Sequence, residues 1–302
     1  MGNGAINCCE ASSSMIEEMS MLSPRNMKSP QRANIINEVS QTKNIIGNEG
    51  QEIVNRISKL KSLQTSSKLQ IKVVNSGPIP KDMRYYITHQ GLENSKRNFK
   101  DGKVYFGSKR KERGFVVNDI VIPVQNKDIE DHRGRHFCIY FSIERDCFFI
   151  KDLGKGFGAY VRLDSPLVRY KQILKENMII NIGSSFLAFS QVVYEKKPIL
   201  NIKIMGEERG NMCFEGNENE DKFISIGRGI TCDLRLDDNL LSKTHSTVFY
   251  NSNGWNLVDG DMQKKSTNGT WLYLSEDLEI YSSMIFKANQ TVFQVVSVTN
   301  NF

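Results

Sequence analysis

The feature that most constrains the fold is a regular succession of short β-type runs that begins at Leu69. Runs rich in Val, Ile, Phe and Tyr alternate with turns rich in Gly, Asn and Asp, at a spacing of about 8–12 residues. Few stretches in this part of the chain have helical periodicity. This pattern is typical of antiparallel β-sandwiches, so we predict an all-β fold from residue 69 onward.

The pattern occurs twice in the same order, at a lag of about 110–120 residues, which indicates tandem copies of one fold. Three segments of the first copy have counterparts in the second: Val104–Gly107 with Ile224–Gly227, Asn118–Ile122 with Cys232–Leu236, and Arg135–Ile139 with Ser242–His245. The predicted domains are a tail over residues 1–68, a first β-sandwich over 69–197 and a second over 198–302. The composition of the tail predicts that most of it is disordered.

Charge is distributed unevenly between the two copies. The chain has a net charge of +6, but residues 71–197 carry 23 basic and 14 acidic side chains, whereas residues 198–302 carry 9 and 14. A basic surface can bind nucleic acid, and it can equally be a solvated face. We disfavour nucleic acid because the charged loops of the basic copy have no interleaved aromatic residues.

Several classes of protein are excluded by what the sequence lacks. No run of about 18 apolar residues indicates a transmembrane helix, and the first forty residues contain no apolar signal core. The six cysteines form no C-x-x-C pair, and only four histidines accompany them, so we expect no metal site and no cofactor. This cysteine usage is typical of a reducing, cytoplasmic compartment.

The domain organisation also bears on catalysis. The two sandwiches and the tail leave no segment for a catalytic domain, so we expect no enzyme activity.

The first nine residues suggest a lipid anchor. Gly2 follows Met1, as N-myristoylation requires, although Ile6 stands where the motif prefers Ser or Thr. The adjacent Cys8 and Cys9 resemble the palmitoylation sites of dually acylated proteins, and two acyl chains give stable membrane binding. The alternative is an unmodified, disordered start.

A short amphipathic helix is predicted over residues 51–63. Ile53, Ile57 and Leu60 fall on one helical face, and basic residues lie elsewhere. The pattern leaves open whether this helix lies on a membrane, packs on the next domain, or does neither.

The second copy contains three short motifs in order: Gly227-Arg228, Ser242-Lys243-Thr244-His245, and Thr267-Asn268-Gly269. Together they resemble the forkhead-associated (FHA) domain. The resemblance covers residues 198–302, and it implies a β-sandwich that binds phosphothreonine peptides through loops at one end. The expected partner is therefore a threonine-phosphorylated protein.

The resemblance also implies roles for individual residues. Arg228 is expected to bind the phosphate with its planar guanidinium, assisted by the Lys243 ammonium. Hydroxyls of Ser242 and Thr267 can donate to phosphate, and the Asn268 amide can bond to the peptide backbone. The structural residues are Gly227, which would allow a turn that aims Arg228, His245, which would tie loops together, and Gly269, which would adopt a backbone angle that favours glycine.

Each of these residues also has a simpler interpretation. Arg228 alone would commonly form a surface salt bridge, with Asp233 as a candidate partner. Ser242 alone would be a turn or cap residue, and Thr267-Asn268-Gly269 is also an ordinary hairpin turn. The joint pattern favours the phosphate site.

The first copy departs from the FHA pattern. Ser108 follows Gly107 where Arg is expected, Arg133 stands three residues before His136 where Ser is expected, and Phe157-Gly158-Ala159 replaces Asn-Gly-Thr. We therefore expect this copy to keep the fold and to lack phosphothreonine recognition. Its loops carry basic residues that are candidates for contact with an anionic membrane surface: Lys109, Arg110, Lys111, Arg113, Arg133 and Arg135.

These observations predict a non-catalytic, phosphothreonine-binding adaptor in signalling, tethered to the cytoplasmic face of a membrane. The alternative is a phosphorylation-independent scaffold built of two β-sandwiches.

Overall fold

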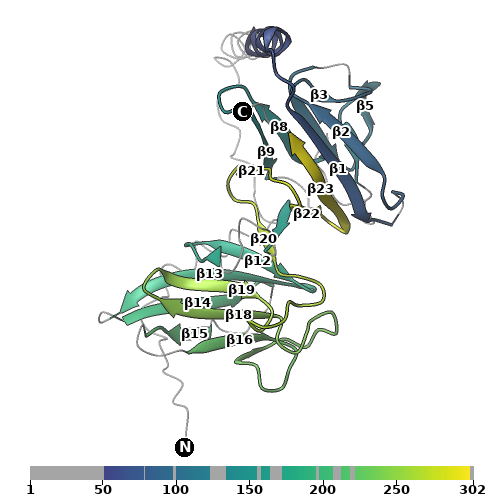
Figure 1. Cartoon of the computed structure of the whole chain (residues 1–302). Helices are drawn as coiled ribbons and strands as arrows, with labels where there is room; N and C mark the ends of the chain where they lie inside the picture. Colours follow the sequence, from purple (N-terminus) through teal and green to yellow (C-terminus); the bar gives the residue numbers. More distant parts are fainter. Residues whose placement is uncertain are drawn as a thin grey trace, which may run out of the picture. The chain divides into compact units, whose positions relative to one another are not determined.

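The computed structural model describes residues 51–77, 79–97, 100–122, 134–154, 158–163, 172–194, 197–206, 212–217 and 222–299. The described residues are mostly β-strand, which confirms the predicted all-β fold (Figure 1). The chain divides into two compact units. We call the one that contains residues 171–268 the middle unit. The other, which combines the described residues between 51 and 170 with those from 269 onward, we call the split unit.

The split unit has two main sheets. In one, the strands follow the order β20 (Trp271–Tyr273), β10 (Tyr160–Arg162), β22 (Ile285–Ala288), β23 (Thr291–Thr299), β1 (Lys68–Asn75), β2 (Arg84–Thr88) and β3 (Gly91–Leu92). In the other, the order is β21 (Leu278–Glu279), β9 (Cys147–Asp152), β8 (Arg135–Ser142), β4 (Lys103–Gly107) and β7 (Ile120–Val121). A separate two-stranded hairpin joins β5 (Lys111–Glu112) and β6 (Phe115–Val116).

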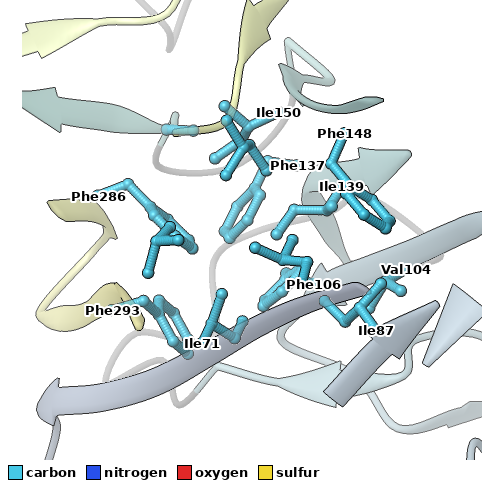
Figure 2. Close-up of a cluster of buried hydrophobic side chains, with 14 of the residues drawn as sticks. Ile71, Ile87, Val104, Phe106, Phe137, Ile139, Phe148, Ile150, Phe286 and Phe293 are labelled. Carbon is cyan, nitrogen blue, oxygen red and sulfur yellow. The ribbon is translucent and has the colours of Figure 1, made fainter. Parts of the chain in front are cut away.

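The core of the split unit lies between these sheets. Strand β1 alternates buried and partly exposed residues, and Leu69, Ile71 and Val73 all point into the core. Phe106 of β4 and Phe293 of β23 are fully buried in the same cluster (Figure 2). The core therefore combines strands from both ends of the chain.

The middle unit also has two sheets. One follows the order β11 (Gln172–Ile173), β19 (Gly254–Asp259), β18 (Ser246–Asn251), β16 (Phe223–Gly227) and β17 (Leu234–Arg235). The other contains the neighbours β15 (Met212–Glu215), β14 (Lys197–Ile204), β13 (Ser185–Tyr194) and β12 (Met178–Ile182). Its buried residues include Ile180, Phe189, Ile202, Trp255 and Leu257.

These units do not coincide with the contiguous domains 69–197 and 198–302 that the sequence suggested. Strand β1 pairs with β23 from the end of the chain, whereas β13 pairs with β14. The split unit is thus completed by β22 and β23 from the end of the chain, whereas β12 and β13 belong to the middle unit; we call this arrangement the strand exchange. Periodicity could not show this, because the apolar pattern of a strand predicts that one face is buried and does not specify which other strand pairs with it.

The predicted helix is present over residues 51–62, and it packs on the split unit. Leu60 is fully buried, whereas Ile53 is 43% exposed. Arg56 fixes the helix by donating from Nε to the Asp101 carbonyl at 2.8 Å and from Nη2 to the Phe141 carbonyl at 2.7 Å. Of the three placements that the pattern left open, packing on the next domain is the observed one. Residues 1–50, with Gly2, Cys8 and Cys9, lie outside the described residues.

Within the described ranges, no helix has the length and apolar character that crossing a bilayer requires. Among the same residues, His, Cys, Asp and Glu form no group of three that could hold a metal ion.

Candidate functional site

Strand pairing brings the three sequence motifs to one edge of the middle unit. Strand β16 ends at Gly227, and β18 begins at Ser246, which pairs with both Ile226 of β16 and Asp259 at the end of β19. In antiparallel sheets the end of one strand lies beside the start of its neighbour. The loops that follow β16 and β19 therefore meet the loop that precedes β18.

Gly227 is needed for close packing between two of these loops. A Cβ at this position would lie 2.3 Å from the Lys243 carbonyl oxygen, so no larger residue fits. This differs from the expected role as a turn residue, because Gly227 is the last residue of β16. The next residue continues the contact, since the Arg228 N–H donates to the Ser242 carbonyl at 3.1 Å.

Arg228 is exposed and is oriented by one side-chain hydrogen bond. Its Nε donates to the Leu241 carbonyl at 2.7 Å. Asp233, the candidate salt-bridge partner, instead accepts from the N–H and the hydroxyl of Ser225, both at 2.8 Å. The guanidinium is thus held beside the Ser242 loop, where its two terminal nitrogens can donate hydrogen bonds to a ligand.

Ser242 and Thr267 join two loops. The Thr267 N–H donates to the Ser242 hydroxyl oxygen at 3.0 Å, and the two hydroxyls lie 3.4 Å apart. Asp259 positions the second loop, because its carboxylate accepts from the Ser266 hydroxyl at 2.6 Å. These bonds place two hydroxyls on the same edge as Arg228.

His245 and Asn268 complete the connections. The buried His245 ring accepts at Nδ1 from the Ser242 N–H at 3.2 Å, a hydrogen bond within the loop that precedes β18. Asn268 is exposed, and its Nδ2 donates to the Leu240 carbonyl at 2.7 Å. The Lys243 side chain is exposed on the same loop. The structure therefore brings together all five residues that the sequence assigned to ligand binding.

Gly269 begins the split unit and has a φ of +78°, a conformation that L side chains rarely adopt. A Cβ there would also lie 2.3 Å from Nε of Arg162. Both observations agree with the backbone role expected for this glycine.

Sequence reasoning missed Asp238, which supports the Ser242 loop. Its carboxylate accepts from the Leu240 N–H at 2.8 Å, and from the Ser184 N–H at 2.7 Å and hydroxyl at 2.8 Å. Partial burial raises the pKa of the Asp238 carboxyl, but these hydrogen bonds lower it more, so it lies below its ordinary value. No motif signals this role, because Ser184 lies 54 residues away in the turn between β12 and β13.

Two exposed aliphatic side chains also flank the site. Ile230 is 84% exposed and follows Arg228 by two residues, and Leu240 is 56% exposed beside Asn268. The edge thus offers apolar as well as polar contacts to a ligand.

The corresponding edge of the split unit is built differently. His136 is buried, and a Cβ on Gly107 would lie 2.1 Å from the Gly134 carbonyl, so the close loop packing is retained. Arg135 is partly buried: its guanidinium lies 3.6 Å from the ring centre of Tyr105, and Nη2 donates to the Val117 carbonyl. Arg135 therefore does not join the exposed basic residues. Arg133 and Phe157 lie outside the described residues.

The middle unit presents an arginine, two hydroxyls and an amide on loops at one end of its paired strands. Residues 224–281 match the FHA domain family, in agreement with the three motifs. FHA domains generally bind phosphothreonine-containing proteins and are typically non-catalytic. No curated protein and no solved structure matches the chain.

Proposed function

We propose that the protein is a non-catalytic adaptor that binds a threonine-phosphorylated protein through Arg228, Ser242, Lys243, Thr267 and Asn268. The observation that carries this proposal is the hydrogen-bonded edge on which Arg228 and the Ser242–Thr267 pair lie together. The alternative of a phosphorylation-independent scaffold has no comparable support, since a scaffold does not need these groups on one edge.

The chemistry of the edge suits a phosphate monoester. Such a group carries a charge of about −1.5 to −2 near neutral pH and has three acceptor oxygens. Arg228 can bind two of them with its terminal nitrogens, and the Ser242 hydroxyl can donate to the third. Asn268 stands at the end of the edge, where an amide can fix the register of an extended peptide.

The charge of the middle unit does not oppose this assignment. Residues 171–268 carry 12 basic and 13 acidic side chains, so this unit is close to neutral. Charges farther away than about 8–10 Å are screened at physiological salt, so the ligand responds mainly to the local cations Arg228 and Lys243.

The full-length protein is expected to bind phosphothreonine peptides from a library with a dissociation constant in the micromolar range, about −8 kcal/mol. Arg228→Ala should weaken binding about 10–100-fold, because a hydrogen bond to a charged group contributes about 1.5–3 kcal/mol. Ser242→Ala should act in the same direction. Calorimetric titration with the selected peptide and its unphosphorylated form measures both effects. The full chain is required because β12 and β13 belong to the same unit as the site.

Lys222→Ala provides the matched control. Lys222 is exposed and precedes β16, at the opposite end of the strand from Arg228, so its loss removes one positive charge without touching the site. Equal binding of phosphorylated and unphosphorylated peptides by the wild type would refute the adaptor and favour the scaffold.

We further propose that the adaptor is held at the cytoplasmic face of a membrane by acyl chains on Gly2, Cys8 and Cys9. The support is the Met-Gly start and the adjacent cysteine pair, since stable anchoring needs a second signal besides one myristoyl chain.

Mass measurement of the N-terminal peptide from protein made in eukaryotic cells is expected to show a myristoyl group on Gly2 and palmitoyl groups on Cys8 or Cys9. Gly2→Ala should remove the myristoyl group, and Cys8→Ser with Cys9→Ser should remove only the palmitoyl groups. Each change should release protein from the membrane fraction. An unmodified Gly2 in the wild type would refute the anchor.

A further inference from the structure

Residues 109–116 of the split unit form a compact hairpin, which we call the basic hairpin. Strands β5 and β6 pair with each other through Lys111 with Val116 and Glu112 with Phe115. The two turn residues, Arg113 and Gly114, have φ values of +46° and +86°. Positive φ at both central residues defines the tight turn that matches the twist of the flanking strands. The hairpin therefore has a defined local shape.

The base of the basic hairpin is fixed to the rest of the split unit. The Val117 N–H donates to the Arg110 carbonyl at 3.1 Å, and the Asn118 amide donates to the Lys109 carbonyl at 2.6 Å. Asn118 is buried, so this contact ties the hairpin to the core. The hairpin thus presents its side chains from a fixed support.

The side chains on the basic hairpin combine positive charge with one large apolar group. Its four basic residues are all exposed: Lys109, Arg110, Lys111 and Arg113. Phe115, next to the turn, is 76% exposed, which is the highest value among the aromatic residues that the structure describes. Glu112 is the one acidic residue of the hairpin. A phenylalanine left this exposed loses the free energy that burial would supply, unless a partner covers it.

We propose that the basic hairpin is a membrane-contact element, in which its four cations bind anionic lipid headgroups and Phe115 inserts into the interfacial region of the bilayer. Basic side chains close to an anionic leaflet each strengthen binding about fivefold. Amphipathic elements bind such surfaces through the combined action of charge and buried apolar area. The proposal is independent of phosphopeptide binding.

An anionic membrane fits the basic hairpin better than nucleic acid does. Proteins that bind single strands stack successive bases on several aromatic side chains, and the hairpin presents one. A single exposed aromatic side chain at a tight turn, surrounded by cations, suits shallow insertion between headgroups. The acyl chains proposed on the same polypeptide would hold the hairpin near such a surface.

The test uses full-length protein without acyl chains and phosphatidylcholine vesicles prepared with or without phosphatidylserine. The wild type is expected to sediment only with the phosphatidylserine vesicles, and less so as salt is raised. Replacing all four hairpin cations by Glu should weaken this binding at least about hundredfold. Phe115→Ser should weaken it about tenfold with no change in charge.

Two control variants should bind the vesicles as the wild type does. Lys59→Glu with Lys61→Glu reverses two exposed charges on the helix, and Val193→Ser removes an apolar side chain that is 74% exposed on β13. An unchanged circular dichroism spectrum and an unchanged unfolding midpoint reported by Trp271, which lies in the same unit, would show that the hairpin variants are folded. No binding of the wild type to anionic vesicles would overturn the proposal. The proposal would also be overturned if Phe115→Ser bound the vesicles as the wild type does and single-stranded RNA displaced the protein from them, because this result would indicate a nucleic-acid-binding surface.

Discussion

Cysteines introduced at Gln70 and Ser297 are expected to form a disulfide within one chain in nearly all molecules. Gln70 of β1 pairs with Ser297 of β23 in the antiparallel ladder, at the end of the regular stretch that precedes a register shift between Gln70 and Ile71. Directly opposed residues have Cα atoms about 4.5–5.5 Å apart, within the range that disulfides span. Mass spectrometry after mild oxidation, with digestion between the two positions, measures the cross-link.

The matched control pairs the same Gln70→Cys with Ser190→Cys. In β14, Leu200 and Ile202 are buried as Leu69 and Ile71 are in β1, so Asn201 corresponds to Gln70, and the partner of Asn201 is Ser190. If the domains were contiguous, β13 would pair with β1, and Gln70 would face Ser190 or its near neighbours. Cross-linking of Gln70→Cys to Ser190→Cys instead of Ser297→Cys would therefore refute the strand exchange.

Local patterns in the sequence predicted the class of fold correctly and missed the exchange, for a physical reason. The alternating burial along β1 requires only that its apolar face pack on a core, and it does not specify which strand pairs with β1. By sequence pattern, both β13 and β23 are candidates for that pairing. Which of them pairs with β1 depends on long-range contacts that no window of residues contains.

The candidate site was more accessible to sequence reasoning because its residues lie close to three strand ends. Arg228 follows β16 directly. Ser242 lies in the loop that precedes β18, and Thr267 lies in the loop that follows β19. Asp238 was missed because its hydrogen bonds to Ser184 depend on which hairpin completes the middle unit.

The strand pairing also changes the interpretation of the net charge. The acidic residues 198–302 do not form one unit, and the unit that contains the candidate site is close to neutral.

The second large effect is expected from Phe293→Ala. Phe293 of β23 is fully buried, and its ring centre lies 5.5 Å from that of Phe106 and 5.3 Å from that of Phe286 (Figure 2). Removing a buried phenyl ring costs about 3–5 kcal/mol, from lost apolar burial and from the cavity that remains. Because Phe106 belongs to β4, Phe293→Ala should lower the free energy of unfolding of the split unit.

The two tryptophans allow the units to be followed separately by fluorescence during denaturant unfolding. Trp255 is buried in the middle unit, and Trp271 is buried in the split unit. In a Trp255→Phe background, Phe293→Ala should lower the unfolding midpoint reported by Trp271. In a Trp271→Phe background, it should leave the midpoint reported by Trp255 nearly unchanged.

Phe189→Ala is the matched control for this experiment. Phe189 of β13 is also fully buried, but it lies in the middle unit, so its loss should lower the midpoint reported by Trp255 and spare the one reported by Trp271. Contiguous domains make the opposite prediction. Phe293 would then share one domain with both tryptophans, and its loss would shift both midpoints, whereas Phe189 would shift neither. The two substitutions together therefore decide which strands complete each core.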